Sequence, residues 1–296
     1  MPFDRTDLSS LLSNIDALIN QVYWFKQKVK KPRGASHRGT AITYVDIKEK
    51  RDDFLRELKS TMLNWVYSNN KYESIYTEEL NKRNDDHLNT NAYLFNLVEE
   101  KFRRGHPQGQ FGELLLFNFI QYFFSAPPLL RKMPITTNPN LERNGADAIH
   151  YYSDGEKDIF ILGESKCYES KYSFNKAIEA SVGSIVESFN NLDNELILYL
   201  YDDFVNPSLE KIAKDFKDGK SKNARIELVC LIAYNETKNV DAESEDEIKQ
   251  KIKKCILDRC NATNGNIYEG IRTSIVNRIH YIIFPFWQLD KLLNNF

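Results

Sequence analysis

Two carboxylates and an ammonium group lie close together in one short stretch of the chain, NGADAIHYYSDGEKDIFILGESK at residues 144–166. The stretch predicts two adjacent strands, because β-branched and aromatic residues flank a turn signal at Asp154-Gly155. Asp147 opens the first predicted strand, and Glu164 and Lys166 close the second. Metal-assisted phosphodiester cleavage needs such a set, since carboxylates hold the ion and a cation stabilises developing negative charge.

The register of this hairpin decides whether the two carboxylates meet. A turn of two or four residues centred on the Asp-Gly pair places Asp147 opposite Leu162, with Glu164 as its diagonal neighbour on the same face. Diagonal neighbours are roughly 7–8 Å apart, close enough to share one divalent ion. Asp158 lies on the same face of the strand as Glu164. It is six residues away, however, which is about 20 Å along the strand, so it cannot share the ion. A turn of three or five residues would move Asp147 to the opposite face.

The donor atoms indicate which ion the site would take. Oxygen ligands favour Mg²⁺ or Mn²⁺ over zinc, and we expect one of these as the cofactor. Lys166 would orient the attacking water and stabilise the negative charge. The backbone carbonyl of Ser165 is a further candidate ligand. The alternative interpretation is that Asp147, Glu164 and Lys166 are solvated charges at strand ends, because Glu-x-Lys is a short motif.

Glu113 is a second candidate, on a preceding apolar helix. At 100° per residue it aligns with Phe117, Ile120 and Phe124, the most apolar stripe of that helix. A carboxylate that faces a core is costly unless it is paired or bound to a metal. Glu113 is therefore either a third metal ligand, which we favour, or one half of a structural ion pair.

Composition narrows the class of protein. The 296 residues are 42% hydrophobic and 28% charged, which is typical of a globular chain with a sizeable core. No run approaches about 18 apolar residues, so we expect no membrane span. The N-terminus lacks the pattern of a secretory signal, and the four cysteines form no Cys-x-x-Cys pair, so we expect a cytoplasmic protein without a zinc site.

A net charge of −2 means that nucleic acid would be contacted through a local patch or a partner. The one basic cluster comprises Lys26, Lys28, Lys30, Lys31, Arg33 and Arg38, with His37. It is either a solvated linker or an arm that contacts phosphates or a partner.

The N-terminal part predicts mainly helices. The expected elements are a helix over 7–29, a strand over 40–47, and helices over 50–67 and 92–102. The polar residues 68–91 are compatible with either a loop or short helices. A break at Arg103–Pro107 divides the chain into an N-terminal accessory region (1–105), which offers a surface for a partner, and a chemical domain (106–296).

The second region predicts a mixed α/β fold with helices on both faces of the sheet. Its first half is expected to contain a helix that begins at Gly109 and is stopped by Pro127, then strands over 131–137, 146–152 and 158–166, and a helix over 174–189. Its second half is expected to contain a strand over 195–201, a short helix from Pro207, a strand over 226–234, a helix over 244–260, a short helix near 267–277, a strand over 280–284 and a terminal helix. Ser244 and Glu247 form a capping box at the start of the helix over 244–260.

These residues resemble a known nuclease superfamily. Asp147, then Glu164-Ser165-Lys166 after an apolar strand, with Glu113 on a preceding helix, are similar to the PD-(D/E)XK pattern, although Ala146 replaces the usual Pro. More narrowly, GQFGE-LLLF, NGADAIHYY, ILGESKCY and HYIIFPF resemble the HamA family of bacterial Hachiman anti-phage defence. The resemblance implies a restriction-endonuclease-like core in the order α-β-β-β-α-β, and a DNA nuclease that acts with a helicase partner, HamB.

Two functions from different classes fit the sequence. The first is a metal-dependent DNA nuclease, the effector of a two-protein defence system. The alternative is a non-catalytic DNA-binding or adaptor subunit that keeps a nuclease fold. The chain has no phosphate-binding GxxxxGK[ST] loop, so any dependence on ATP must come from another protein.

Overall fold

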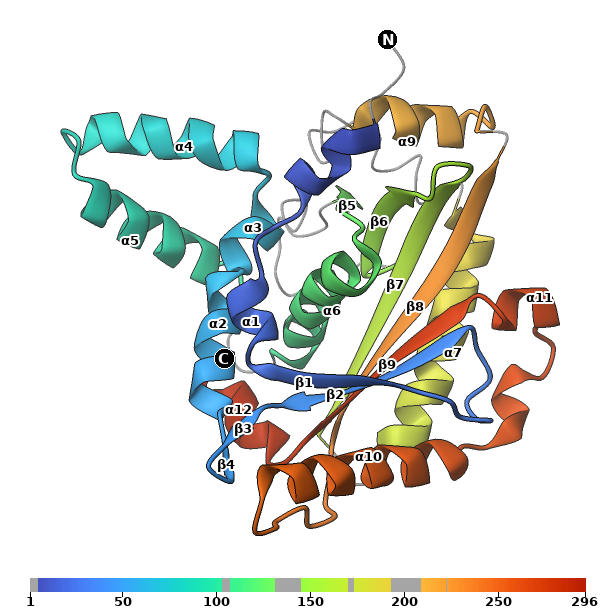
Figure 1. Cartoon of the computed structure of the whole chain (residues 1–296). Coiled ribbons are helices and arrows are strands. Elements are labelled where there is room, and N and C mark those ends of the chain that lie inside the picture. The colour runs from blue at the N-terminus through green and yellow to red at the C-terminus, as the bar shows by residue number, and fades with distance from the viewer. Residues whose placement is uncertain (1–4, 103–106, 131–144, 170–172, 193–208, 222) are drawn as a thin grey trace.

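A seven-stranded sheet organises the molecule (Figure 1). The computed structural model describes residues 5–102, 107–130, 145–169, 173–192, 209–221 and 223–296. In spatial order the strands are β1 (Val22–Gln27), β2 (Ser36–Ile42), β9 (Ile279–Phe286), β8 (Ala224–Asn235), β7 (Asp158–Tyr168), β6 (Ala148–Ser153) and β5 (Pro128–Leu130). A separate pair consists of β3 (Tyr44–Val45) and β4 (Lys48–Glu49).

The centre of the sheet is parallel and its two sides are antiparallel. β2, β9, β8 and β7 run parallel to one another, while β1 pairs with β2, and β6 with β7 and β5, in antiparallel fashion. Parallel strands need both faces covered, and β8 is fully buried from Leu228 to Ala233. The predicted mixed α/β fold is therefore confirmed.

Helices cover both faces of the sheet. The described helices are η1 (Arg5–Leu11), α1 (Asp16–Ile19), α2 (Arg51–Ser60), α3 (Met62–Val66), α4 (Asn69–Lys82), α5 (His87–Glu99), α6 (Gln108–Phe124), α7 (Ser173–Asn190), α9 (Glu210–Lys217), α10 (Glu245–Asn261), η4 (Gly265–Tyr268), α11 (Thr273–Val276) and α12 (Leu289–Asn294).

Alternate residues of each central strand enter two different cores. Leu162 packs in the core that contains the buried residues of α7 and α10, whereas Ile161 packs in the core that contains α2, α3 and α6. This alternation follows from the two-residue period of a strand. We call the first side of the sheet the α7 face and the second side the α6 face.

The predicted helix over residues 7–29 is wrong. The structure has η1 and α1 there, and the chain is extended from Val22 to Gln27. The aromatic residues of β1 alternate between faces: Trp24 packs against Phe123 of α6, while Phe25 packs on the α7 face. Pairing with β2 thus overrides the helical spacing of the apolar residues. The predicted strand over 40–47 is also shifted, because β2 begins at Ser36 and ends at Ile42.

The N-terminal region and the rest of the chain share this sheet. β1 and β2 lie before residue 105, yet β2 pairs with β9. Phe54 of α2 lies 5.7 Å from Phe284 of β9, ring centre to ring centre. A boundary at residue 105 would therefore cut through one sheet and one core.

The part of the N-terminal region that stands apart is the α4–α5 arm, which projects away from the sheet in Figure 1. It occupies most of the polar stretch that the sequence left open. The helix predicted from Ala92 begins earlier, at His87, because Asp86 accepts a hydrogen bond from the backbone of Asn89 at 3.0 Å. None of the residues of α4 is buried.

The remaining predicted elements agree with the described structure or lie outside it. The helix predicted over 50–67 is present but divides at Thr61 into α2 and α3. α6, β6, β7, α7, β8, α10, β9 and α12 lie close to their predicted positions, and Ser244 caps α10 as expected. The strands predicted over 131–137 and 195–201 and the start of a helix at Pro207 fall outside the described residues. No helix in the described ranges has the length and apolar character to cross a membrane.

Candidate active site

The hairpin that carries the candidate residues closes one position later than predicted. Its loop covers residues 154–157, and Ser153 pairs with Asp158. Asp154 causes this, because its side chain accepts hydrogen bonds from the backbone of Glu156 at 3.0 Å and Lys157 at 2.8 Å. Leu162 consequently faces Ile149, and the predicted pairing of Leu162 with Asp147 is wrong by two positions.

The error does not separate the two carboxylates, because the loop has an even number of residues. Ala148 pairs with Gly163, so Asp147, one residue earlier, comes level with Glu164. The backbone N–H of Asp147 donates to the carbonyl of Gly163 at 2.8 Å. The new register thus places Asp147 beside Glu164 rather than one diagonal step away.

Ser165 holds the side chain of Asp147. Both its backbone N–H and its hydroxyl donate to Oδ2 of Asp147, at 2.9 and 3.0 Å. The carboxylate thus accepts the hydrogen bond that a backbone carbonyl would accept if the pairing of β6 with β7 continued. Two donors on one oxygen fix the direction of the carboxylate.

Glu164 and Lys166, which flank Ser165 on β7, form an ion pair with each other. Lys166 Nζ lies 2.7 Å from Glu164 Oε1, and the two side chains are 26% and 5% exposed. Burial opposes the charge of Lys166, but the charges of Glu164 and then Asp147 outweigh it and raise the pKa of Lys166. Lys166 is therefore an ammonium ion that both carboxylates influence.

Two glycines let α6 approach this segment closely. A Cβ on Gly163 would lie 2.8 Å from Ile120 and 2.9 Å from Leu116, both on α6. A Cβ on Gly112 would lie 3.2 Å from the hydroxyl oxygen of Ser165. Gly163 directly precedes Glu164, so the Gly-Glu-Ser-Lys motif combines close helix packing with the charged residues.

Glu113 lies at the N-terminal part of α6, half-buried, one residue after the glycine that packs on Ser165. Its predicted stripe does face the sheet, since Phe117 contacts His150 of β6 and Ile120 reaches Gly163 of β7. In the part of the chain that the structure describes, no three His, Cys, Asp or Glu side chains are grouped so that they could hold a metal ion. The role of Glu113 as a third ligand, like that of the Ser165 carbonyl, stays a prediction.

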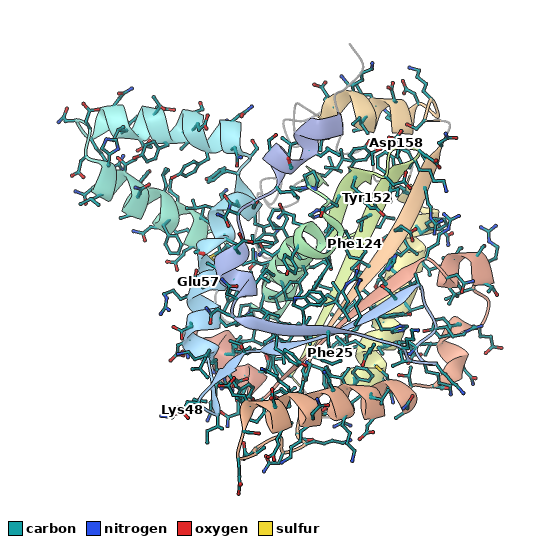
Figure 2. All side chains as sticks on the ribbon, in the orientation of Figure 1. Phe25, Lys48, Glu57, Phe124, Tyr152 and Asp158 are labelled. Carbon is teal, nitrogen blue, oxygen red and sulfur yellow. The ribbon has the colours of Figure 1, made fainter. Side chains whose placement is uncertain are left out.

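Two neighbours of the candidate residues, Asp158 and His150, have structural partners. Asp158 accepts a hydrogen bond from the hydroxyl of Tyr151 at 2.7 Å. Figure 2 shows it beside Tyr152, at the end of the sheet next to α9. His150 is buried, with Nδ1 2.8 Å from the carbonyl oxygen of Ala126.

The hydroxyl of Ser165 and the contact of Gly112 were not predicted from the sequence. A signal for both was present: a small polar residue between Glu164 and Lys166, and a glycine directly before Glu113 in an otherwise bulky helix. Cys230, the strand partner of Glu164 on β8, is a buried thiol, and burial raises the pKa of Cys230 to about 12.

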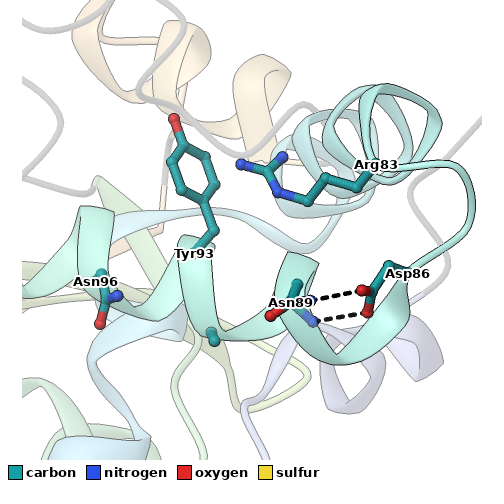
Figure 3. Close-up of a pocket in the computed structure, with 6 residues that line it drawn as sticks. Arg83, Asp86, Asn89, Tyr93 and Asn96 are labelled. Atoms are coloured by element: carbon teal, nitrogen blue, oxygen red, sulfur yellow. Dashed lines mark hydrogen bonds between the residues drawn. The ribbon is translucent and has the colours of Figure 1, made fainter.

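Two surface hollows lie away from these residues. One, of about 560 Å³, lies at the turn of the α4–α5 arm (Figure 3), where the guanidinium of Arg83 sits 4.0 Å from the centre of the Tyr93 ring. The other, of about 520 Å³, lies between α2, Phe95 of α5 and the C-terminal end. Neither is lined by Asp147, Glu164 or Lys166.

Comparison with protein families shows which family the chain is similar to. The model of the protein family described as HamA matches residues 19–296, which is nearly the whole chain. It includes β1 and β2 as well as the hairpin with Asp147, Glu164 and Lys166. No curated protein matches the chain.

Proposed function

Because the chain belongs to the HamA family, and so is a component of Hachiman defence, we propose that it is the metal-dependent DNA nuclease of that system. One observation carries the proposal: Asp147 and Glu164 lie side by side at the end of the β6–β7 hairpin, and both act on the charge of Lys166. An adaptor would have no need of a buried carboxylate and a cation in this place, since burying charge is costly.

The order of elements supports a PD-(D/E)XK core. The described elements run α6, β5, β6, β7, α7, α9 and β8, which is the order α-β-β-β-α-β with α9 as an additional helix before β8. In this arrangement the Asp would come from the start of β6, the Glu and Lys from β7, and Glu113 from α6.

The carboxylates fit the proposed cofactor by the chemistry of their donors. Asp147 and Glu164 present oxygen atoms, the ligands that Mg²⁺ and Mn²⁺ prefer, with Glu113 and the carbonyl of Ser165 as further proposed ligands. When bound, such an ion neutralises charge on the scissile phosphate and lowers the pKa of a bound water.

The remaining roles belong to the chain's own residues. Lys166 places a positive charge where the phosphate becomes more negative, and Glu164 keeps that ammonium in position. Ser165 holds the Asp147 carboxylate at a fixed orientation through two hydrogen bonds. Asp147 and Glu164 are the residues that would hold the ion next to the substrate phosphate.

A helicase subunit similar to HamB completes the proposal. Hachiman membership supports a two-protein system, and the chain itself lacks a GxxxxGK[ST] loop for ATP. The partner would supply the ATP-driven step and restrain cleavage until DNA is engaged.

The test is cleavage of plasmid DNA by the purified chain, with and without the helicase, in Mg²⁺ or Mn²⁺. Glu164→Ala and Lys166→Ala should each lower the rate by at least about 100-fold, the usual cost of removing a group that stabilises the transition state. Asp158→Asn is the matched control, since it changes a carboxylate on the same strand at the far end of the sheet.

Two results would contradict the proposal. Mn²⁺-dependent cleavage that persists in the Glu164→Ala, Lys166→Ala double variant would place the chemistry elsewhere. Absence of cleavage by the wild-type chain with either metal, even with the helicase present, would favour the non-catalytic DNA-binding or adaptor subunit.

A further inference from the structure

The basic cluster of the N-terminal region lies beside a second set of lysines. The loop between β1 and β2 carries Lys28, Lys30, Lys31 and Arg33, and all four side chains are exposed. α10 adds Lys249 and Lys253, one helical turn apart, next to β1. We call these six residues the basic edge, because β1 is the edge strand of the sheet.

The loop of the basic edge is anchored to the sheet rather than free. Pro32 is buried, and its carbonyl oxygen lies 2.7 Å from Nε2 of the buried His37. The backbone of Ala35 donates to the carbonyl of Ile279 at 2.7 Å. The guanidinium of Arg33 sits 4.8 Å from the centre of the Tyr268 ring. These contacts argue against the interpretation of residues 26–38 as a solvated linker.

The lysines of α10 are also held in place. Ile248 and Ile252 bury the inner side of α10, which turns Lys249 and Lys253 towards β1. Lys253 Nζ lies 5.4 Å from the centre of the Phe25 ring, and Lys249 Nζ lies 5.7 Å from that of Tyr23. Figure 2 shows Phe25 directly above α10. Contact with aromatic faces limits the motion of these ammonium groups.

The basic edge has a local excess of positive charge in a chain whose net charge is −2. Within the described residues, Lys249 alone of the six pairs with a carboxylate, that of Asp246 at 3.8 Å. Asp246 is 94% exposed, so this pair is weak. Five of the six cations therefore have no ion-pair partner among those residues.

We propose that the basic edge binds the phosphodiester backbone of DNA at a distance from the cleavage site. Lysine is depleted in protein–protein interfaces, whereas lysine and arginine make most phosphate contacts, so this composition favours a polyanion over a protein. That the polyanion is DNA rests on the proposed nuclease function.

The distance between the basic edge and the proposed site is within the length of a short duplex. Phe25 and Glu164 lie on the α7 face of the sheet, on strands that are four places apart in the order β1-β2-β9-β8-β7. Four strand spacings are about 19 Å, which is the length of about six base pairs. The basic edge would thus hold the duplex about half a turn from the bond that is cut.

The experiment measures binding of the full chain to a labelled 30-base-pair duplex in EDTA, where the proposed cleavage is switched off. The test variant is Lys28→Gln, Lys31→Gln, Lys253→Gln. Its control is Lys71→Gln, Lys82→Gln, Lys211→Gln, which removes three exposed lysines of α4 and α9. Each lost phosphate contact should lower the slope of log affinity against log salt by about 0.9.

We expect the test variant to bind about 10- to 100-fold more weakly at low salt, with a slope lower by about 2–3, and the control to change less than about threefold. Equal losses in both variants, or none in either, would overturn the proposal. So would weaker binding of poly-glutamate with unchanged binding of DNA, because the surface would then fit an acidic protein.

A failure of the proposed function gives a different pattern. If the chain is not a nuclease, the binding difference between test and control variants persists while no metal supports cleavage. If only the basic edge is misassigned, Glu164→Ala still abolishes cleavage and the test variant binds DNA as the wild type does.

Discussion

Asp147 depends on a hydroxyl group that belongs to the middle residue of the Glu-Ser-Lys motif. Ser165 donates twice to one oxygen of the carboxylate, and α6 packs on Ser165 through Gly112. The orientation of Asp147 is thus determined by a contact between a helix and a strand, rather than by the turn that brings Asp147 near Glu164. Ser165 is a positioning residue in the proposed site.

Ser165→Ala should lower the cleavage rate roughly 10-fold, because one charge-assisted hydrogen bond is lost while the backbone donor remains. Weaker binding of Mn²⁺, followed by calorimetry without DNA, separates this role from a general loss of stability. Ser181→Ala on α7 is the matched control, since its buried hydroxyl has no hydrogen-bond partner among the residues that the structure describes. Unchanged rate and unchanged Mn²⁺ binding in Ser165→Ala would contradict the positioning role.

The residues of the proposed site stand out in the sequence, but their register could not be predicted from it. Asp147, Glu164 and Lys166 are recognisable because two short strands and a turn place charged residues at one end. The exact pairing depended on which backbone groups the side chain of Asp154 binds. That choice is decided by local hydrogen bonds and is invisible in the pattern of apolar residues.

A buried ion pair between Glu236, just after β8, and Arg259 of α10 joins these two elements on the α7 face. Burial opposes the charge of Glu236, but hydrogen bonds from Arg259 outweigh it and lower the pKa of Glu236 to about 2. Arg259 donates to both carboxylate oxygens, at 2.9 and 2.6 Å, and the Glu236 side chain is 0% exposed. The pair ties α10 to the end of the central strand.

This ion pair predicts a specific loss of stability in acid. A depressed pKa stabilises the fold above the ordinary value of 4.5, and this contribution is lost as the pH falls from 4.5 to about 2. Glu236→Gln should therefore be about 3 kcal/mol less stable at pH 7, and the two proteins should converge in acid. Urea unfolding at several pH values measures this difference.

The control for this prediction is Glu78→Gln on α4, where the carboxylate is 66% exposed and pairs with Lys82. Its unfolding curves should follow those of the wild type at every pH, since exposed pairs contribute little. A constant difference between Glu236→Gln and the wild type from pH 7 to 3 would show that the charge of Glu236 is not the cause.

Helices whose apolar residues recur at helical spacing, and pack on the sheet at that spacing, could be predicted from the sequence. α6, α7 and α10 each present an apolar stripe to the sheet and have clear ends. Residues 22–27 were not, because their apolar side chains fit a helical stripe equally well. They become a strand because β2 offers a pairing edge and both faces of β1 find partners, Trp24 on one side and Phe25 on the other.

At the scale of the whole molecule, the two predicted regions depend on each other. The sheet crosses the boundary at residue 105, and Phe54 and Trp65 of the N-terminal region lie in the same core as Phe284 and Phe286 of β9. Removal of the first region would expose the edge of β9 and one side of that core. Residues 1–105 therefore cannot be an accessory region that is structurally independent of the rest of the chain.

We predict that residues 106–296, produced alone, show no cooperative thermal transition, while the full chain shows a single one. The exposed strand edge and apolar core should also make the fragment aggregate. Differential scanning calorimetry and light scattering test both expectations. A fragment that melts cooperatively near the temperature of the full chain would contradict the shared core.

The control cuts the same chain at a place where little is buried. A protease site inserted between Asn84 and Asp85, two exposed residues at the α4–α5 turn, divides the chain without touching the sheet. After cleavage the two pieces should stay together and melt as the intact chain does, because the pairing of β2 with β9 is preserved.

The pairing of β2 with β9 also sets the order in which the chain can fold during synthesis. The β1–β2 hairpin leaves the ribosome early, but its partner strand lies roughly 240 residues later, about 10–50 s at 5–20 residues per second. For that time the inner edge of β2 has no native neighbour. β9 is the last strand to be made, and it joins the β1–β2 hairpin to the rest of the sheet.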